Sequence, residues 1–206
     1  MRSVTADHYF SQDPATAQRP RTVAYQVHGR EYRLDSAGGV FSADRLDAGT
    51  AVLLRKAPLP GPDTTGTLLD LGCGYGPISA VLVSEAPRIT VYAVDVNRRA
   101  LELVRRNADA VGAGARVVPA TPDEVPADLR FAQIWSNPPI RVGKAELHTL
   151  LDRWLPRLAP DGVAWLVVAR HLGGDTVQRW LVEERGWRVE RHASQKGYRV
   201  LRVTHS

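Results

Sequence analysis

The sequence predicts an α/β protein with a mostly parallel sheet whose last two strands are antiparallel. The chain has 206 residues, which suits one α/β domain with a short addition. Its content of 44% hydrophobic and 24% charged residues is ordinary for a globular chain that buries a core. Beyond residue 66, short apolar runs alternate with amphipathic stretches, which is the rhythm of βαβ units covered on both faces. We therefore expect one principal core.

A turn-rich segment divides the chain. Pro58, Pro60, Gly61, Pro62 and Gly66 lie close together, and such a cluster interrupts helices and strands. We expect residues 1–60 to form an N-terminal extension packed on the core and residues 61–206 to form the main domain.

The extension contains one hairpin signal and one helix signal. Apolar and polar residues alternate in Thr22–Val27 and Glu31–Leu34 on either side of His28–Gly29, which predicts a β-hairpin. Further on, Asp44 is expected to cap a helix that carries Leu46, Val52, Leu53 and Leu54.

The main domain shows strands and helices in alternation. Strands are expected at Thr67–Leu71, Thr90–Asp95, Ala115–Val118, Phe131–Ser136 and Val163–Ala169. Helices are expected to begin at Pro77, at Asn97 and near Lys144, with a last one around Thr176–Glu184.

The chain ends on a different pattern. Trp187–His192 and Tyr198–Thr204 read as strands, and only residues 193–197 join them. Five residues are too few for a crossover helix, so this terminal pair must be antiparallel.

Several classes of protein are excluded by what the sequence lacks. No apolar run approaches 18 residues, and the first residues lack the hydrophobic stretch of a secretory signal, so we expect a cytoplasmic protein without a membrane partner. Cys73 is the single cysteine, which excludes an intrachain disulfide. One cysteine among six scattered histidines predicts no metal site.

The positive charge is concentrated near the C-terminus. The net charge of the chain is +5, and residues 141–206 alone account for that excess. Of the 27 basic residues 24 are arginine, a side chain suited to bidentate phosphate contacts and to stacking on bases. The last third is thus either a polyanion-binding face or an ordinary solvated surface.

A glycine-rich loop follows the first strand of the main domain. It runs from Asp70 to Pro77 with glycine at 72, 74 and 76, so the backbone can turn tightly beside a ligand. The spacing is neither the dinucleotide fingerprint nor the phosphate loop of nucleoside triphosphate sites. A nucleoside without phosphate remains, with a purely structural turn as the alternative. The pattern D-x-G-x-G-x-G resembles the first motif of the Rossmann-like S-adenosylmethionine-dependent methyltransferases.

An acidic residue closes the next strand. Asp95 stands where a carboxylate can accept hydrogen bonds from the two hydroxyls of a ribose. Alternatively, Asp95 caps the helix that follows at Asn97, and the two uses are compatible.

The fourth expected strand of the main domain ends in Ser136-Asn137-Pro138-Pro139-Ile140. The prolines stop the strand and restrict the backbone beside Asn137. The Asn137 amide and the Pro138 carbonyl could then hold an amino group with its lone pair aimed at a methyl donor. An ordinary strand-ending turn is the alternative.

Together these motifs resemble one family. D-L-G-C-G-Y-G-P, S-N-P-P-I-R-V-G-K, G-V-F-S and K-G-Y-R-V are similar to the small methyltransferases that include bacterial 16S ribosomal RNA guanine-N2 methyltransferases, in their short form. The resemblance implies a seven-stranded sheet with an antiparallel last strand and S-adenosylmethionine as methyl donor. It assigns the donor's methionine end to Asp70, Gly72, Gly74 and Gly76, its ribose to Asp95, and the target amine to Asn137 and Pro138.

The resemblance also implies an RNA-contacting set. Arg141 and Lys144 follow the N-P-P motif and would contact RNA phosphate, although Lys144 could simply decorate the next helix. Phe41 would stack on the substrate base or pack in the core. Pro139 and Ile140 complete the expected substrate site, with Ile140 where many amine methyltransferases have an aromatic residue.

The sequence thus predicts a methyltransferase acting on an exocyclic amine of RNA, in first place guanine N2 of small-subunit ribosomal RNA. One alternative is a protein glutamine-amide N-methyltransferase, against which Ile140 and the basic last third both count. The other is a non-catalytic, S-adenosylmethionine-binding RNA assembly factor, because motifs report the geometry of a pocket and not a rate.

Overall fold

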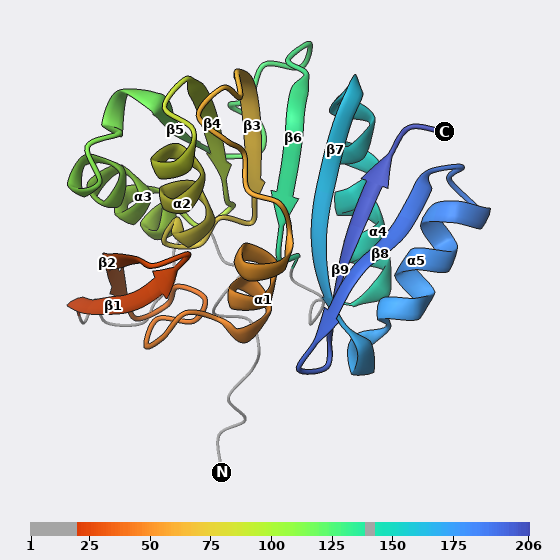
Figure 1. Ribbon diagram of the computed structural model, residues 1–206, viewed down its shortest axis with the longest axis horizontal. Coiled ribbons are helices and arrows are strands. Elements are labelled where there is room, and N and C mark those ends of the chain that lie inside the picture. The colour runs from red at the N-terminus through yellow and green to blue at the C-terminus, as the bar shows by residue number, and fades with distance from the viewer. Residues whose placement is uncertain (1–19, 139–142) are drawn as a thin grey trace.

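The main sheet has seven strands within the part of the chain that the structure describes. A computed structural model describes residues 20–138 and 143–206. It contains β3 (Gly66–Leu71), β4 (Ile89–Val94), β5 (Val117–Ala120), β6 (Phe131–Ser136), β7 (Leu158–Ala169), β8 (Arg188–Gln195) and β9 (Tyr198–Thr204) in the spatial order β5-β4-β3-β6-β7-β9-β8 (Figure 1). The pairs among β3 to β7 are parallel, whereas β9 is antiparallel to both β7 and β8. The expected fold is confirmed.

Some strand boundaries differ from those expected. A 3-10 turn, Gly114–Arg116, takes the place of the start expected at Ala115, and the Arg116 N–H closes it by donating to the carbonyl of Ala113 at 2.8 Å. The link between β8 and β9 is only Lys196–Gly197, not five residues. Their φ angles of 51° and 79° suit a tight two-residue hairpin turn.

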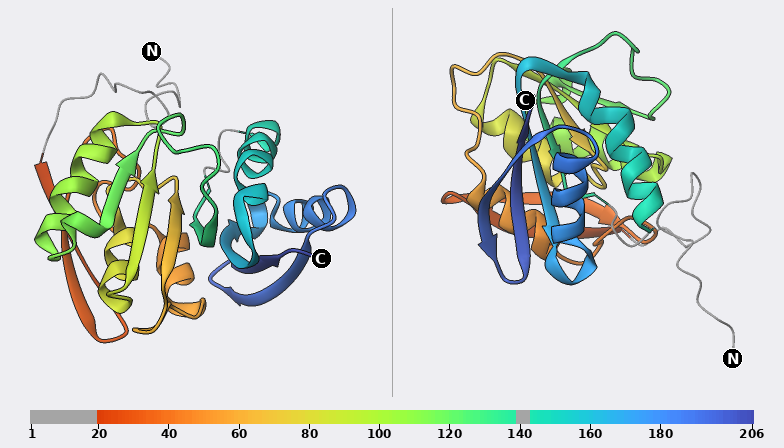
Figure 2. Two further views of the ribbon diagram at one scale, coloured as in Figure 1. Left: turned by 90° about the horizontal axis from the view of Figure 1, so that it is seen from above. Right: turned by 90° about the vertical axis from the view of Figure 1, so that its right-hand side faces the viewer.

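Helices cover both faces of the sheet. Helices α1 (Ala48–Lys56), α2 (Pro77–Glu85) and α3 (Arg98–Ala110) lie on one face, and α4 (Lys144–Trp154) and α5 (Gly174–Glu183) on the other (Figure 2). Strand side chains alternate between the two cores: in β7, Trp165 and Val167 join the first, and Leu166 and Val168 the second. This alternation is why strands buried on both faces are continuously apolar in sequence.

The predicted hairpin forms and packs on the main domain. Its strands are β1 (Pro20–Val27) and β2 (Arg30–Ala37), and their buried side chains share a core with α2 and α3. The Tyr25 hydroxyl donates to the carbonyl of Pro77 at 3.1 Å. Asn107 of α3 exchanges two hydrogen bonds with the backbone of Asp35. The extension therefore rests on the start of α2, while its boundary at residue 60 stays a prediction.

The cap expected for the next helix was wrong. The N-cap of α1 is Asp47, whose Oδ2 accepts from the backbone N–H groups of Gly49 at 2.7 Å and Thr50 at 3.0 Å. Asp44 lies too early for this geometry and pairs instead with Arg21, and Leu46 precedes the helix.

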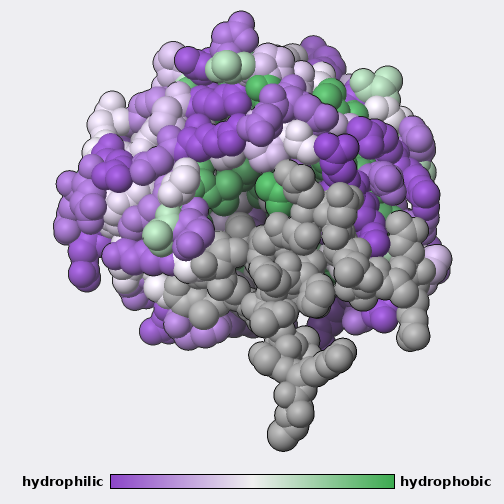
Figure 3. Space-filling view, turned by 180° about the vertical axis from the view of Figure 1, so that it is seen from behind, coloured by the Kyte–Doolittle hydropathy of each residue, from purple (hydrophilic) through white to green (hydrophobic). Residues whose placement is uncertain are grey.

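Seen from behind, the described part of the surface is mainly hydrophilic, with a small group of hydrophobic residues showing near the centre of the view (Figure 3). Among the described residues, no helix has the length and apolar character needed to cross a membrane.

Candidate functional site

The glycine loop is held open at the end of β3. Gly72, Gly74 and Gly76 all have positive φ angles, and the N–H groups of Gly72 and Cys73 donate to the carbonyl of Val94 at 2.8 and 3.0 Å. A Cβ added at Gly72 or Gly74 would meet nothing within 4 Å. Open space therefore lies over the first half of the loop, as a ligand close to the backbone requires.

Asp95 is built into the same loop. One carboxylate oxygen accepts from the N–H of Gly74 and the other from the N–H of Asn97, each at 2.9 Å. Burial raises the pKa of Asp95, and these backbone donors oppose that rise. The side chain that caps α3 is Asn97, so Asp95 keeps lone pairs for the hydroxyls of a ribose.

Asp70 lies beneath the loop. It is 0% exposed, and its Oδ2 accepts from the hydroxyl of Ser79 at 2.7 Å and from the Ser79 N–H at 3.0 Å. Burial raises the pKa of Asp70 to about 7. Asp70 therefore ties β3 to α2. Its assignment to the donor's methionine end stays a prediction, as does that of Gly76, which begins α2.

A cavity joins the loop to the N-terminal extension. Its walls come from three parts of the chain, which are the segment before and within α1, the glycine loop with the start of α2, and the end of β6; they include Phe41, Ser42, Asp47, Thr50, Gly72, Gly74, Tyr75, Ile78 and Asn137. Phe41 is 43% exposed, so it belongs to the rim and does not pack in the core. The structure thus brings the predicted donor loop, Phe41 and Asn137 together.

Asn137 follows the last residue of β6, and two residues at the start of α1 bind its side chain. Its Nδ2 donates to Oδ2 of Asp47 at 2.7 Å and to Oγ1 of Thr50 at 3.0 Å. Pro138 is buried beside it. The predicted substrate residues Pro139, Ile140 and Arg141 lie outside the described residues.

Asp47 and Thr50 are site residues that the sequence reasoning missed. The only local signal is Asp47-Ala48-Gly49-Thr50 ahead of the apolar run at 52–54, which resembles any capped helix start. Only the fold shows that these two residues face Asn137, which lies 90 and 87 residues further along the chain.

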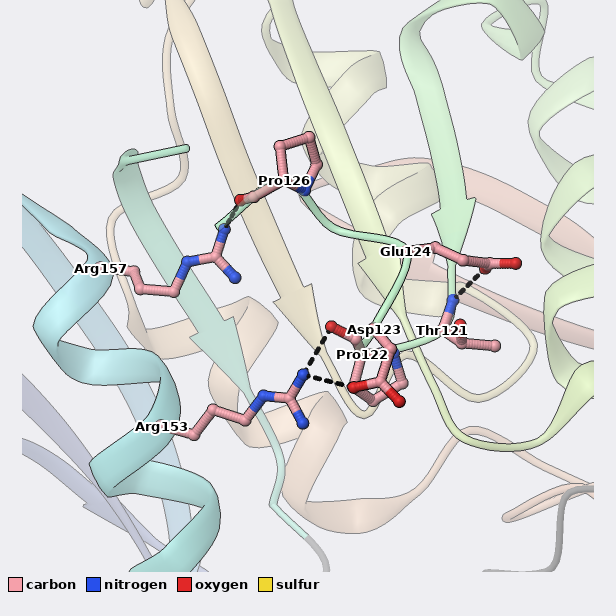
Figure 4. A network of polar contacts seen from close by, with 7 residues as sticks. All are labelled: Thr121, Pro122, Asp123, Glu124, Pro126, Arg153 and Arg157. Atoms are coloured by element: carbon pink, nitrogen blue, oxygen red, sulfur yellow. Dashed lines mark hydrogen bonds and ion pairs between the residues drawn. The ribbon is translucent and has the colours of Figure 1, made fainter. Parts of the chain in front are cut away.

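Much of the basic C-terminal third is occupied by internal contacts. Figure 4 shows Arg153 of α4 donating to the carbonyl of Pro122 at 2.7 Å and to Asp123 at 2.8 Å, and Arg157 bonding the carbonyl of Pro126. These contacts hold the loop after β5 against α4 and the residues that follow it. Within this loop, the Thr121 N–H donates to the Glu124 carboxylate. Further along, Arg185 pairs with Asp152, Arg191 and Arg199 with Asp175, and Arg202 with Glu190. The arginines of the last third therefore do not form one continuous surface that is free to bind a polyanion.

Exposed cations also lie at the edge of the sheet that carries the site, among them Lys144, Arg170 and Lys196. Lys144 begins α4 after the N-P-P segment, and Arg170 follows β7. The Arg170 N–H donates to the carbonyl of Gly197 at 2.9 Å, which brings Arg170 beside Lys196 in the β8–β9 turn. Figure 1 shows this turn and α1 on the side toward which β6 points. Within residues 20–138 and 143–206, no side-chain hydrogen bond or ion pair engages Lys144, Arg170 or Lys196.

Strand order, the glycine loop and the acid after β4 define the class of Rossmann-like methyltransferases that use S-adenosylmethionine. The space over Gly72 and Gly74 and the carboxylate of Asp95 fit this donor. Residues 31–202 match the family described as Methyltransferase small domain. The chain belongs to this family.

Three relatives show which proteins this chain is similar to. YbxB of Bacillus subtilis (strain 168) is 31% identical over 200 residues, covering 96% of this chain and 98% of that protein. Ribosomal RNA small subunit methyltransferase C of Pseudomonas aeruginosa (strain UCBPP-PA14) is 38% identical over 178 residues, covering 77% of this chain. The chain covers 50% of the length of that enzyme and 34% of its counterpart in Aeromonas hydrophila.

Solved structures share the fold. The T. thermophilus 16S rRNA N2-guanine methyltransferase, solved with S-adenosylmethionine and guanosine, superposes with a TM-score of 0.76 at 24% identity, over 94% of this chain and 52% of that one. A ribosomal protein L11 methylase from Lactobacillus delbrueckii gives a TM-score of 0.58 at 18% identity, over 70% and 72% of the two chains.

Proposed function

We propose that the protein methylates an exocyclic amine of RNA, with guanine N2 of small-subunit ribosomal RNA as the target. The observation that carries this proposal is the orientation of Asn137. Its amide nitrogen is engaged by Asp47 and Thr50, which leaves the amide oxygen to accept from a substrate amine. Acting on ribosomal RNA, the protein would work in the cytoplasm.

The chain's own residues would bind the donor and orient the acceptor. Asp95 would hold the ribose, and the open face of Gly72 and Gly74 would receive the methionine portion. S-adenosylmethionine supplies a methyl group on a sulfonium: the nitrogen–carbon bond forms as the carbon–sulfur bond breaks with its electron pair on sulfur, and the methylated amine releases a proton to water.

Asn137 and Pro138 would aim the amine. The amine of guanine is a weak nucleophile because its lone pair is delocalised into the ring. Two acceptors, Oδ1 of Asn137 and the carbonyl of Pro138, would take its two hydrogens and turn the lone pair toward the methyl group. Orientation by preorganised groups is the contribution that this chemistry needs most.

Several features favour RNA as the acceptor. The ribosomal RNA enzymes of Pseudomonas aeruginosa and Aeromonas hydrophila named above are relatives over 77% and 60% of this chain. Phe41 presents an exposed ring at the rim of the cavity, where it would stack on a base. Lys144, Arg170 and Lys196 lie at the same sheet edge and would contact phosphates.

The direct test supplies methyl-labelled S-adenosylmethionine to the purified protein with ribosomal RNA lacking the modification, and in parallel with total cell protein. We expect label in RNA, recovered as N2-methylguanosine after digestion. Asn137→Ala should bind the donor normally while transfer falls about 10²- to 10³-fold. Label in glutamine side chains, or donor binding with no transfer to either acceptor, would refute the proposal in favour of one of its two alternatives.

Charge variants test the RNA contact. Arg170→Glu/Lys196→Glu should weaken RNA binding and flatten its salt dependence by roughly 0.7–0.9 logarithmic units per lost phosphate contact. The matched control is Arg179→Glu/Arg188→Glu, an equal charge change in α5 and at the opposite end of β8. Equal effects of the two pairs would mean that net charge alone drives binding.

A further inference from the structure

Three residues of the N-terminal extension surround the amide of Asn137. Oδ2 of Asp47 takes three hydrogen bonds, from the N–H groups of Gly49 and Thr50 and from Nδ2 of Asn137. The hydroxyl of Thr50 accepts the second hydrogen of Nδ2. The backbone at the start of α1 therefore fixes the Asp47 carboxylate independently of its contact with Asn137.

This arrangement decides which way the amide faces. A carboxylate only accepts hydrogen bonds, so the nitrogen of Asn137, and not its oxygen, must face Asp47. Both hydrogens of that nitrogen are used. Oδ1 lies on the other branch of the amide, 3.2 Å from where a Cβ on Gly49 would stand, and no donor within the described ranges binds it. The amide oxygen is thus presented as a free acceptor.

Because Gly49 has no side chain, Asp47 and Asn137 can approach each other closely enough to form their hydrogen bond. A Cβ there would lie 2.9 Å from Cε1 of Tyr198, 3.0 Å from Oδ2 of Asp47 and 3.2 Å from Oδ1 of Asn137. Any side chain at this position would press on the carboxylate and on the amide oxygen together. Glycine is accordingly the residue that fits between Asp47 and Asn137.

We propose that Asp47 is a positioning residue for methyl transfer, which acts on the acceptor amine through Asn137. This inference rests on the proposed function. A charge-assisted hydrogen bond to the amide N–H draws negative charge onto the amide oxygen. Oδ1 then accepts more strongly from the amine, whose nitrogen becomes positive as its bond to the methyl carbon forms. Asp47 thus fixes the orientation of the amide and strengthens it as an acceptor.

The test separates capping from positioning. Asp47→Ser keeps a good helix cap but loses the reach and the charge toward Asn137. We expect its single-turnover rate with saturating donor and RNA to fall about 10²-fold, the scale for a preorganised polar group. Donor affinity and the KM for RNA should stay near wild type, and a thermal melt checks that the fold is kept. Asp47→Asn, which keeps an acceptor without charge, should lose less.

Exchanging the carboxylate and the amide between positions 47 and 137 gives a result that a merely structural role of Asp47 would not produce. Asn137→Asp places two carboxylates in contact, so activity should vanish at neutral pH and return in part on acidification, as the pair binds a shared proton. Asp47→Asn/Asn137→Asp restores one amide and one carboxylate in exchanged places. This double variant should exceed Asn137→Asp by at least about tenfold at neutral pH.

The outcomes distinguish the two proposals. Wild-type protein that fails to methylate RNA overturns the proposed function and this inference with it. Wild-type transfer accompanied by an undiminished rate in folded Asp47→Ser overturns only the role of Asp47. So does a loss of donor affinity in Asp47→Ser that matches its loss of rate, because Asp47 would then bind the donor. A double variant no better than Asn137→Asp also overturns it.

Discussion

Gly72→Ala tests whether the open face of the glycine loop is the donor site. Gly72 has a φ of 74°, and a methyl group added there would contact no other part of the described protein. Gly186 offers a matched control, because it has a φ of 70° and equally open surroundings between α5 and β8. The two substitutions impose the same backbone strain, and only one lies at the loop.

The magnitudes follow from this geometry. An alanine in the left-handed region costs roughly 1–2 kcal/mol, so both variants should lose about that much free energy of unfolding. A methyl group forced into an occupied, well-packed space costs about 1–3 kcal/mol, which corresponds to a loss of affinity of roughly 5- to 150-fold. Only Gly72→Ala should lose affinity in this way. The loss should be similar for S-adenosylmethionine and for S-adenosylhomocysteine.

Two assays separate strain from steric exclusion. Urea unfolding should give similar midpoints for Gly72→Ala and Gly186→Ala, and calorimetric titration with S-adenosylmethionine should give weak binding for Gly72→Ala only. Wild-type affinity in a folded Gly72→Ala variant would refute the assignment of this space to the donor. Equal loss of affinity in both variants would show that strain, and not contact, is responsible.

Three further predictions concern buried polar groups. Asp95→Asn should weaken binding of S-adenosylmethionine about 10- to 100-fold by calorimetry, since hydrogen bonds to a charged group contribute roughly 1.5–3 kcal/mol; unchanged affinity would remove Asp95 from the ribose site. Burial raises the pKa of Asp70 from its ordinary value of 3.8 to about 7, so the folded state binds more protons between these values. Wild-type stability should therefore fall as the pH rises from about 4 to 7, by at most about 4 kcal/mol from this group, and urea titrations should show a flatter profile for Asp70→Asn. Asn107→Ala removes bonds to the backbone of Asp35 and to the carbonyl of Tyr75, and should cost roughly 2–4 kcal/mol of unfolding free energy; an unchanged urea midpoint would contradict this role.

The helix caps show how far local reasoning extends. Pro77 and Asn97 mark the starts of α2 and α3 as expected, because proline geometry and side-chain capping act within a few residues. The same logic chose Asp44 for α1, although Asp47 makes the cap. Both carboxylates precede the apolar run, and only the folded chain places Arg21 beside Asp44.

The surface arginines show a different limit. Composition indicates an excess of positive charge but not which charges are neutralised by neighbours. Asp152 and Asp175 meet Arg185, Arg191 and Arg199 only after the helices and strands pack. The cations left exposed near the site are fewer than the sequence suggests. Arg170 belongs to no motif, and Lys196 begins the K-G-Y-R-V motif, to which no RNA contact was assigned.

The sequence by itself determined the order of strands and helices, the antiparallel end of the sheet, the glycine loop and the acid that follows β4. These depend on hydrophobic periodicity, on backbone freedom at glycine and on connection length, all of which are local properties. Only the tertiary structure decided that Asp47 and Thr50 hold the amide of Asn137, that Phe41 lies at the rim, and that Asp70 ties β3 to α2 through Ser79. The physical reason is that a hydrogen bond across 90 residues depends on how α1 packs against the end of β6, and no pattern within either segment records that packing.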